Sequence, residues 1–358
     1  MGNKSVPKSL FKILSVSGIL VFSGNLYAQA LKTIRIASPD LTAGTKHAGG
    51  GVVDVLYTKK WIEQAFAKQN IEVQWHFFKG AGPAINEALA NDQLDFAFTG
   101  DLPPILGKAQ GLNTQLLVPT SRGGTNYLAV RSDLNISSLK QLKGLKIGIL
   151  RGTADELSFV AALKSQGMST QDVKLVNLDF NAVNAALAAK RIDASWGPAR
   201  FFALRDKGLV KLPISTRQLN GIGASQGVFF GRQSFIQKYP NETQLVVDQV
   251  VKGLHWLSQD QNHVPQIALF AAQASYPALV YARELHGVNL KFLYSPRFDG
   301  YYLKNLQQKI DLTHSQGLIR QKIEIKPWVN THFVDQSLRK MQLTDFWTET
   351  NNYQYLKK

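Results

Sequence analysis

The chain contains no cysteine among its 358 residues. This absence excludes a disulfide framework, a thiolate metal site, cysteine-based catalysis and a cysteine that would carry a lipid anchor. Acidic residues are also scarce, since 25 Asp and Glu stand against 41 Lys and Arg, which gives a formal net charge of +16. No run of five basic residues occurs, so we expect a spread, solvated basic surface rather than a nucleic-acid site.

Apolar runs long enough to span a bilayer are missing too. The nearest candidate, Ile13 to Phe22, is preceded by Lys4, Lys8 and Lys12 and followed by Ala28-Gln29-Ala30. That three-part layout is typical of a secretory signal peptide. We therefore predict a signal peptide over residues 1–30, cleaved near Ala30, and an exported mature protein.

Two strand-to-helix turns organise the chain. The first runs from a predicted strand through Gly82 into a helix opened by Pro83, and the second runs through Thr99-Gly100-Asp101 into a helix opened by Pro103-Pro104. The unpaired amides and the dipole of a helix start favour anions, and open α/β sheets bind ligands at this edge. The pair predicts a ligand cleft, in which Asp101 is expected to cap its helix.

The second half of the chain repeats this succession of strand, glycine and helix. Three further turns share it: Arg151-Gly152-Thr153, Asp179-Phe180-Asn181 and Trp196-Gly197-Pro198. A guanidinium beside a helix start suits an oxyanion, although Arg151 could equally be a surface cation. Trp196, at a strand end, is the favoured wall for an organic tail, and Phe180 is a weaker candidate. Thr153 is expected to cap its helix, with Glu156 at the capping-box position.

A long loop follows the first predicted strand, Lys32 to Ala37. It ends in Gly49-Gly50-Gly51 at the start of a helix expected over residues 52–68. The loop is too long and too rich in glycine for a plain connector. We interpret it as a wall facing the ligand, against the alternatives of a flexible surface loop and a solvated His47.

The central stretch also resembles a known family. The aliphatic-sulfonate-binding proteins of ABC importers, within the sulfonate/taurine/nitrate group of periplasmic solute-binding proteins, are similar at Ala81-Gly82-Pro83, Glu87-Ala88-Leu89, Leu94-Asp95-Phe96 and Thr99-Gly100-Asp101-Leu102-Pro103-Pro104. The resemblance implies an α/β fold of two lobes (type II), each a central sheet flanked by helices, joined by two crossover strands. It also implies a monomer that delivers its ligand to an inner-membrane permease with a cytoplasmic ATPase. The long loop departs from the family, in which this turn is shorter.

The lobe boundaries follow from this resemblance and from the predicted strands. We expect lobe 1 at residues 31–126 and 229–345, lobe 2 at residues 127–228, and a polar tail at residues 346–358. The expected return crossing is the strand Val228 to Phe230, after a glycine-rich connector that contains Gln226.

The expected ligand is a small organosulfur anion: an alkyl sulfonate, taurine or a sulfate ester. A pocket of neutral donors with one or two cations suits a monoanion. The candidate ligand-binding residues are Gly50, Gly51, Gly82, Pro83, Thr99, Gly100, Asp101, Arg151, Gly152, Thr153, Phe180, Asn181, Trp196 and Gln226.

Nothing in the sequence predicts an enzyme, a cofactor or a metal site. The histidines lack a metal-ligand spacing, and no phosphate-loop or nucleophile-elbow motif occurs. The possible acid pairs draw on Asp40, Asp95, Asp101 and Asp193. The alternatives are an exported or thiamine-precursor-related enzyme on the same fold, and an importer receptor for nitrate or a pyrimidine.

Overall fold

The computed structural model describes residues 1–4 and 31–357. The predicted signal peptide and its cleavage point lie outside these residues. Two five-stranded sheets form the framework, in one compact unit that begins at Lys32. Among the described residues, no helix combines the length and apolar character that crossing a membrane requires.

The first sheet has the strand order β2-β1-β3-β10-β4. Strands β1, β2 and β3 are parallel, and β10 runs antiparallel between β3 and β4. The strand bounds are β1 (Thr33–Pro39), β2 (Glu72–Phe78), β3 (Phe96–Gly100), β4 (Thr114–Gly124) and β10 (Ser225–Arg232).

The second sheet has the order β7-β6-β8-β5-β9 and the same plan, with β5 antiparallel between β8 and β9. Its strands are β5 (Tyr127–Arg131), β6 (Lys146–Ile149), β7 (Lys174–Asn177), β8 (Ala194–Gly197) and β9 (Val210–Ser215). The antiparallel strand of each lobe is the one that directly follows a crossing between the sheets: β5 follows the outward crossing, and β10 follows the return crossing. The chain leaves the first sheet at the end of β4 and returns at the start of β10, so the predicted fold of two lobes and two crossings is confirmed.

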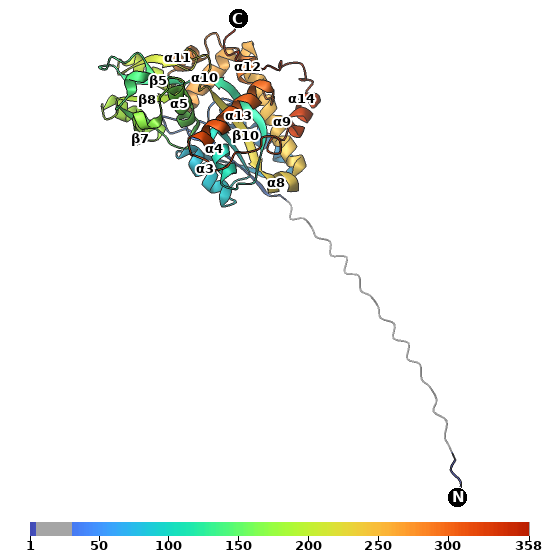
Figure 1. Ribbon diagram of the computed structural model, residues 1–358. Helices are drawn as coiled ribbons and strands as arrows, with labels where there is room; N and C mark the ends of the chain where they lie inside the picture. The colour runs from blue at the N-terminus through green and yellow to red at the C-terminus, as the bar shows by residue number, and fades with distance from the viewer. Residues whose placement is uncertain (5–30, 358) are drawn as a thin grey trace. The chain divides into compact units, whose positions relative to one another are not determined.

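Helices flank both sheets (Figure 1). Those of the first lobe are α1 (Val52–Lys59), α2 (Trp61–Phe66), α3 (Ala81–Ala90), α4 (Leu102–Ala109), α8 (Gln233–Lys238), α9 (Pro240–Leu257), α10 (His263–Ala274), α11 (Ala278–Glu284), α12 (Leu290–Leu293), α13 (Gly300–Ser315) and α14 (His332–Lys340). Those of the second lobe are α5 (Ala154–Lys164), α6 (Phe180–Ala188) and α7 (Phe202–Asp206). Short 3₁₀ turns are η1 (Ala67–Gln69), η2 (Leu139–Leu142), η3 (Thr170–Asp172), η4 (Ala199–Phe201) and η5 (Asp260–Asn262).

Two local features differ from the sequence-based expectation. The helix expected over residues 52–68 is broken at Lys60, which adopts a left-handed backbone (φ 53) between α1 and α2. Strand β9 is an element that the sequence pattern does not predict. It lies at the edge of its sheet, and half of its residues are only partly buried, so its apolar pattern is weak.

A polar tail was expected at residues 346–358. The described part of this segment, residues 346–357, instead packs against the first lobe and the crossings. Trp347 and Tyr355 are each 2% exposed. The Trp347 indole N–H donates to Ser258 Oγ at 3.0 Å, and Leu356 forms a β-bridge with Val288. The two buried aromatic residues stand among mostly exposed, polar neighbours in a short segment, so the sequence pattern does not reveal their burial.

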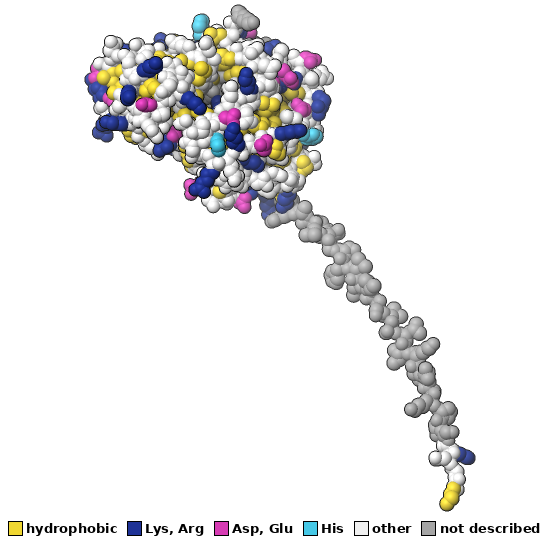
Figure 2. Space-filling view, in the orientation of Figure 1, with side chains coloured by type: hydrophobic (Ala, Val, Ile, Leu, Met, Phe, Trp, Pro, Cys, Tyr) yellow, Lys and Arg dark blue, Asp and Glu magenta, His cyan; other side chains and the backbone are white. Residues whose placement is uncertain are grey.

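The basic residues are dispersed over the face of the molecule that Figure 2 shows. Figure 2 shows Lys and Arg side chains scattered over the visible face and interspersed with Asp and Glu, without a continuous basic field. The charge distribution on this face agrees with a solvated basic surface.

Candidate functional site

A cavity of about 390 Å³ lies at the carboxyl ends of the parallel strands of both sheets. The first lobe lines it with the ends of β1, β3 and β4 and with the start of α1. The second lobe contributes the start of α5, Phe180 of α6 and residues 198–200 after β8. This is the edge at which the strand, glycine and helix pattern predicts a ligand.

Eight of the fourteen predicted site residues line this cavity: Gly50, Gly51, Gly82, Thr99, Gly100, Thr153, Phe180 and Gln226. The other six do not line it: Pro83, Asp101, Arg151, Gly152, Asn181 and Trp196. Among the predicted residues that do not line the cavity, some join the two lobes and others lie in the core of a lobe.

Trp196 is a core residue, so its prediction as a wall of the pocket is wrong. Its side chain is 0% exposed within the core cluster of the second lobe. The indole N–H donates to Ser158 Oγ at 2.7 Å. On β8 successive side chains point to opposite faces, and Trp196 points towards Phe159 of α5 rather than towards the cavity.

Asp101 is not a helix cap. It makes no side-chain cap bond to α4; its carboxylate accepts the Gln226 N–H at 2.9 Å and pairs with Lys309 of α13. It therefore holds the return strand β10 and α13 against the start of α4. Thr153 likewise stands at the N-cap position of α5 without a side-chain cap bond, because its hydroxyl donates to the Leu150 carbonyl at 2.6 Å.

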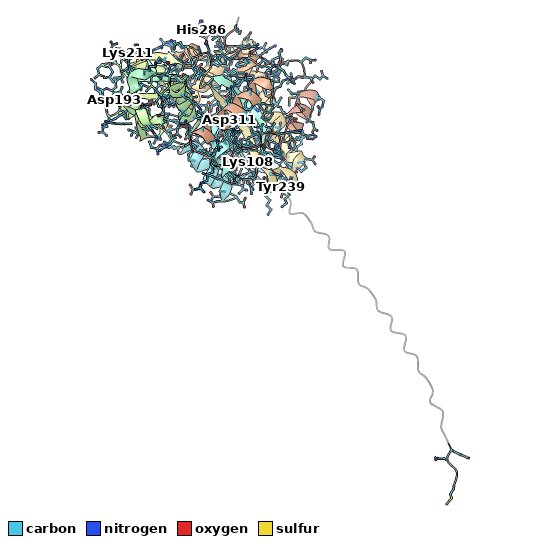
Figure 3. The ribbon with its side chains drawn as sticks, in the orientation of Figure 1. Lys108, Asp193, Lys211, Tyr239, His286 and Asp311 are labelled. Carbon is cyan, nitrogen blue, oxygen red and sulfur yellow. The ribbon has the colours of Figure 1, made fainter. Side chains whose placement is uncertain are left out.

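The possible acid pairs are not brought together. Asp95 pairs with Arg35 and Arg232, while Asp193 pairs with Arg131. Asp193 lies in the second lobe, on the left of Figure 3. Asp95 and Asp193 therefore serve in separate ion pairs, one at each sheet, rather than as an acid pair.

Arg200, which sequence reasoning missed, takes the position in the cavity that the sequence pattern assigns to Arg151. Arg151 is exposed and pairs with Glu156. Arg200 lines the cavity, and its guanidinium lies 4.8 Å from the ring centre of Phe180 and 4.7 Å from that of Phe201. Its Nη2 donates to Asp155 at 3.0 Å. The signal for Arg200 is its place in the turn after Trp196-Gly197-Pro198.

The Arg200 side chain retains hydrogen-bonding capacity. Its Nε is buried and has no partner within residues 1–4 and 31–357. Burial raises the pKa of Asp155, and the neighbouring Arg200 opposes that rise. The pair therefore presents an oriented guanidinium while adding little net charge to the cavity.

Three of the predicted glycines lie at close contacts between elements. A Cβ on Gly100 would lie 2.4 Å from Ala154 Cβ in the second lobe, and one on Gly152 would lie 2.8 Å from Pro83 Cγ in the first. A Cβ on Gly82 would instead meet Pro103 of its own lobe, at 2.1 Å. Gly100 and Gly152 therefore allow the two lobes to approach each other. Pro83 and Gly152 lie where the lobes touch, so they do not line the cavity.

The long loop after β1 is held in place by two carboxylates. Asp40 accepts the Thr42 N–H at 3.3 Å and pairs with His47, whose ring stacks on Phe77. Asp54 of α1 accepts the N–H groups of Gly49 at 2.8 Å and Gly50 at 3.1 Å. The loop is thus an ordered wall.

The same loop reaches the second lobe. Asn181 Nδ2 donates to the Thr42 carbonyl at 3.0 Å. Asn181 therefore acts at the rim between the lobes and not in the cavity.

A further group of interacting residues lies around Glu284 at the cavity, and no sequence pattern predicts it. Glu284 of α11 accepts the hydroxyls of Tyr127 at 2.6 Å and of Tyr355 at 3.0 Å, and it lies 3.6 Å from Arg217. Burial raises the pKa of Glu284, and Arg217 opposes this. These residues are far apart in the chain, so only the fold brings them together.

Comparisons with known proteins agree with this architecture. A protein of Bacillus subtilis (strain 168) named as an aliphatic sulfonates-binding protein is 27% identical over 285 residues, which cover 78% of this chain and 82% of that protein. The structure of a periplasmic sulfonate-binding protein SsuA from Methylobacillus flagellatus KT is 31% identical with a TM-score of 0.77, and covers 91% of this chain and 99% of its own.

The fold also occurs in an enzyme. The desulfurization enzyme DSZB is 16% identical with a TM-score of 0.66, covering 87% of this chain and 99% of its own, and that likeness concerns the fold alone. The family model described as NMT1/THI5 like matches residues 65–263, more than half of the chain. The chain therefore belongs to the NMT1/THI5-like family.

Proposed function

We propose that this protein is the periplasmic solute-binding component of an ABC importer and that it captures an organosulfur anion between its lobes. The observation that supports this most directly is the Arg200 guanidinium beside the start of α5, on a cavity shared by both lobes. The likeness to sulfonate-binding proteins over most of the chain supports the same class of ligand.

The anion cradle combines neutral donors with one cation. The starts of α3 and α5 and the end of β3 border the cavity through Gly82, Thr153 and Thr99. Backbone amides at the helix starts supply neutral donors, and Arg200 supplies a charge-assisted one. The hydroxyls of Thr99 and Thr153 already donate to the carbonyls of Gly100 and Leu150. Because Asp155 offsets the Arg200 charge, this arrangement suits a monoanionic sulfonate or sulfate ester better than a dianion.

Closure of the lobes follows from ligand contacts that both lobes share. A ligand that touches Thr99 and Arg200 together stabilises the closed form, because only that form offers both contacts. The contacts of Gly100 with Ala154 and of Thr42 with Asn181 then complete the closed surface. The mature protein, a monomer that begins after Ala30, would deliver its ligand to an inner-membrane permease driven by a cytoplasmic ATPase, without chemical change.

The proposal is tested by calorimetric titration of the mature protein after unfolding and refolding to remove carried-over ligand. The panel contains alkanesulfonates, taurine, alkyl sulfate esters, nitrate and sulfate. We expect saturable one-to-one binding of an organosulfur anion, recovered unchanged by mass spectrometry. Binding of nitrate or a neutral metabolite alone would overturn the organosulfur assignment, and turnover of the ligand would overturn the assignment as a receptor.

Gly100→Ala is expected to hinder closure. The added methyl group meets Ala154 across the lobes, so the closed form loses about 1 kcal/mol and sulfonate affinity falls about fivefold. Small-angle scattering should show the liganded variant more open than wild type. Ala154→Gly in the same chain removes the clash and should restore binding. An unaffected single variant would show that this contact does not limit closure.

A further inference from the structure

Part of the cavity lining is unsuited to a sulfonate. Beside the strand ends, the wall includes α1, α10, α11 and the end of α12, with apolar or aromatic side chains at Val53, Phe270, Tyr281, Leu293 and Tyr294. Cavities that enclose organic ligands typically measure about 300–1,000 Å³ and are mostly apolar. The volume of about 390 Å³ therefore leaves room for a ligand body well beyond a sulfonate group.

Two carboxylates lie in this wall: Glu284 of α11, which is paired with Arg217, and Asp54 of α1. Asp54 is 2% exposed and borders the cavity. Its Oδ1 accepts the two glycine N–H groups of the long loop, whereas its Oδ2 has no hydrogen-bond partner among residues 1–4 and 31–357. A ligand donor at this oxygen would form a charge-assisted hydrogen bond, which is about twice as strong as a neutral one.

Two phenols accompany Asp54. Tyr294 is 4% exposed, and within the described part of the chain the hydroxyls of Tyr281 and Tyr294 make no hydrogen bond although both residues border the cavity. Burial raises the pKa of both phenols, and the Asp54 charge adds to it; for Tyr294 the Glu284 charge adds more than Asp54 does. The three groups therefore form one electrostatically linked set, which we call the Asp54 subsite.

The Asp54 subsite has no cation to balance it. In the described lining Arg200 is paired with Asp155, and Arg217 outside the lining is paired with Glu284. Burial raises the pKa of Asp54 to about 7, although two amides already favour its charged form. A positive ligand group at this point would therefore recover solvation that the ionised carboxylate has lost.

We propose that the Asp54 subsite binds an ammonium group at the far end of the ligand, so that the preferred ligands are zwitterionic aminosulfonates with an apolar spacer. This inference rests on the proposed function and specifies its substrate class. Arg200 and the start of α5 hold the sulfonate. Asp54 Oδ2 accepts from the ammonium, and the phenol oxygens of Tyr281 and Tyr294 provide further acceptors.

The test compares two homologous series by calorimetry at about pH 8, where the Asp54 carboxylate is mostly ionised. One series is ω-aminoalkanesulfonates, and the other is n-alkanesulfonates of the same length. We expect wild type to prefer the amino series at one spacer length, and Asp54→Asn to reduce that preference by about tenfold or more. Alkanesulfonate binding should change little, since the amide oxygen that this substitution introduces can still accept from Gly49 and Gly50.

Asp311→Asn is the control, because it removes one carboxylate charge at a partly exposed residue that pairs with Lys322 and lies outside the cavity lining. It should leave the preference intact, whereas Tyr294→Phe should reduce it by a smaller factor than Asp54→Asn. An equal preference in wild type and Asp54→Asn overturns the Asp54 subsite while the sulfonate assignment stands. If neither series binds wild type, the proposed function itself fails.

Discussion

Replacing Arg200 with Gln should weaken sulfonate binding by about 10- to 100-fold, equivalent to about 1.5–3 kcal/mol. The guanidinium is held over Phe180 and Phe201, and Arg200 lines the cavity. A charged donor fixed in advance contributes more than a flexible one, because less side-chain entropy is lost on binding. Titration calorimetry with one alkanesulfonate measures the effect.

Further variants distinguish a loss of ligand binding from a loss of folding. Arg200→Gln leaves the buried Asp155 without its cation, so the double variant Arg200→Gln with Asp155→Asn removes both charges. It should fold like wild type by circular dichroism and still bind weakly. Arg205→Gln, which alters a partly exposed arginine paired with Asp206, serves as control. Affinity of the double variant within about twofold of wild type would exclude Arg200 from the cradle.

Trp196→Ala should destabilise the second lobe by about 3–5 kcal/mol. The indole is fully buried against Phe159, and its N–H donates to Ser158. Truncation removes the apolar contacts and leaves a void that the packed core closes only in part. Unfolding by denaturant, followed by circular dichroism, measures the loss.

Two further variants test the assignment of Trp196 to the core rather than to the ligand wall. Trp196→Phe keeps most of the volume and should bind sulfonate like wild type. Trp256→Ala removes a partly buried tryptophan that stacks on Lys59, and it should cost much less stability. If Trp196→Phe lost affinity for sulfonate without losing stability, the assignment to the core would be wrong and Trp196 would contact the ligand.

Much of the fold could be predicted from the sequence because its signals are local. Apolar runs that stop at glycine, followed by proline or threonine, marked β2, β3 and β6 and the helices after them. The two crossings followed from the resemblance, and they lie where β4 and β10 end and begin. Strand β9 and the C-terminal segment escaped because their burial depends on neighbours distant in the chain.

The candidate site was predicted in position but only partly in composition. The sequence located Thr99, Gly100 and Thr153 because they follow strands directly, and all three border the cavity. It could not show that Trp196 points into a core, since one residue of register reverses the face of a strand. The structure also changes the expected role of Gly100 and Gly152. These glycines allow the two lobes to come close to each other, whereas the sequence analysis expected them to let a ligand approach the backbone.

By itself, the sequence determined the edge at which a ligand would bind and most of the strands and helices around it, because these depend on periodicity and turn residues along the chain. The class of fold followed from the family resemblance. Only the tertiary structure decided which charged groups reach the cavity. Asp54, Arg200 and Glu284 come from three separate elements, and their burial and partners depend on how the two lobes fold and meet. Charge pairing and desolvation act through space, so no spacing in the sequence encodes them.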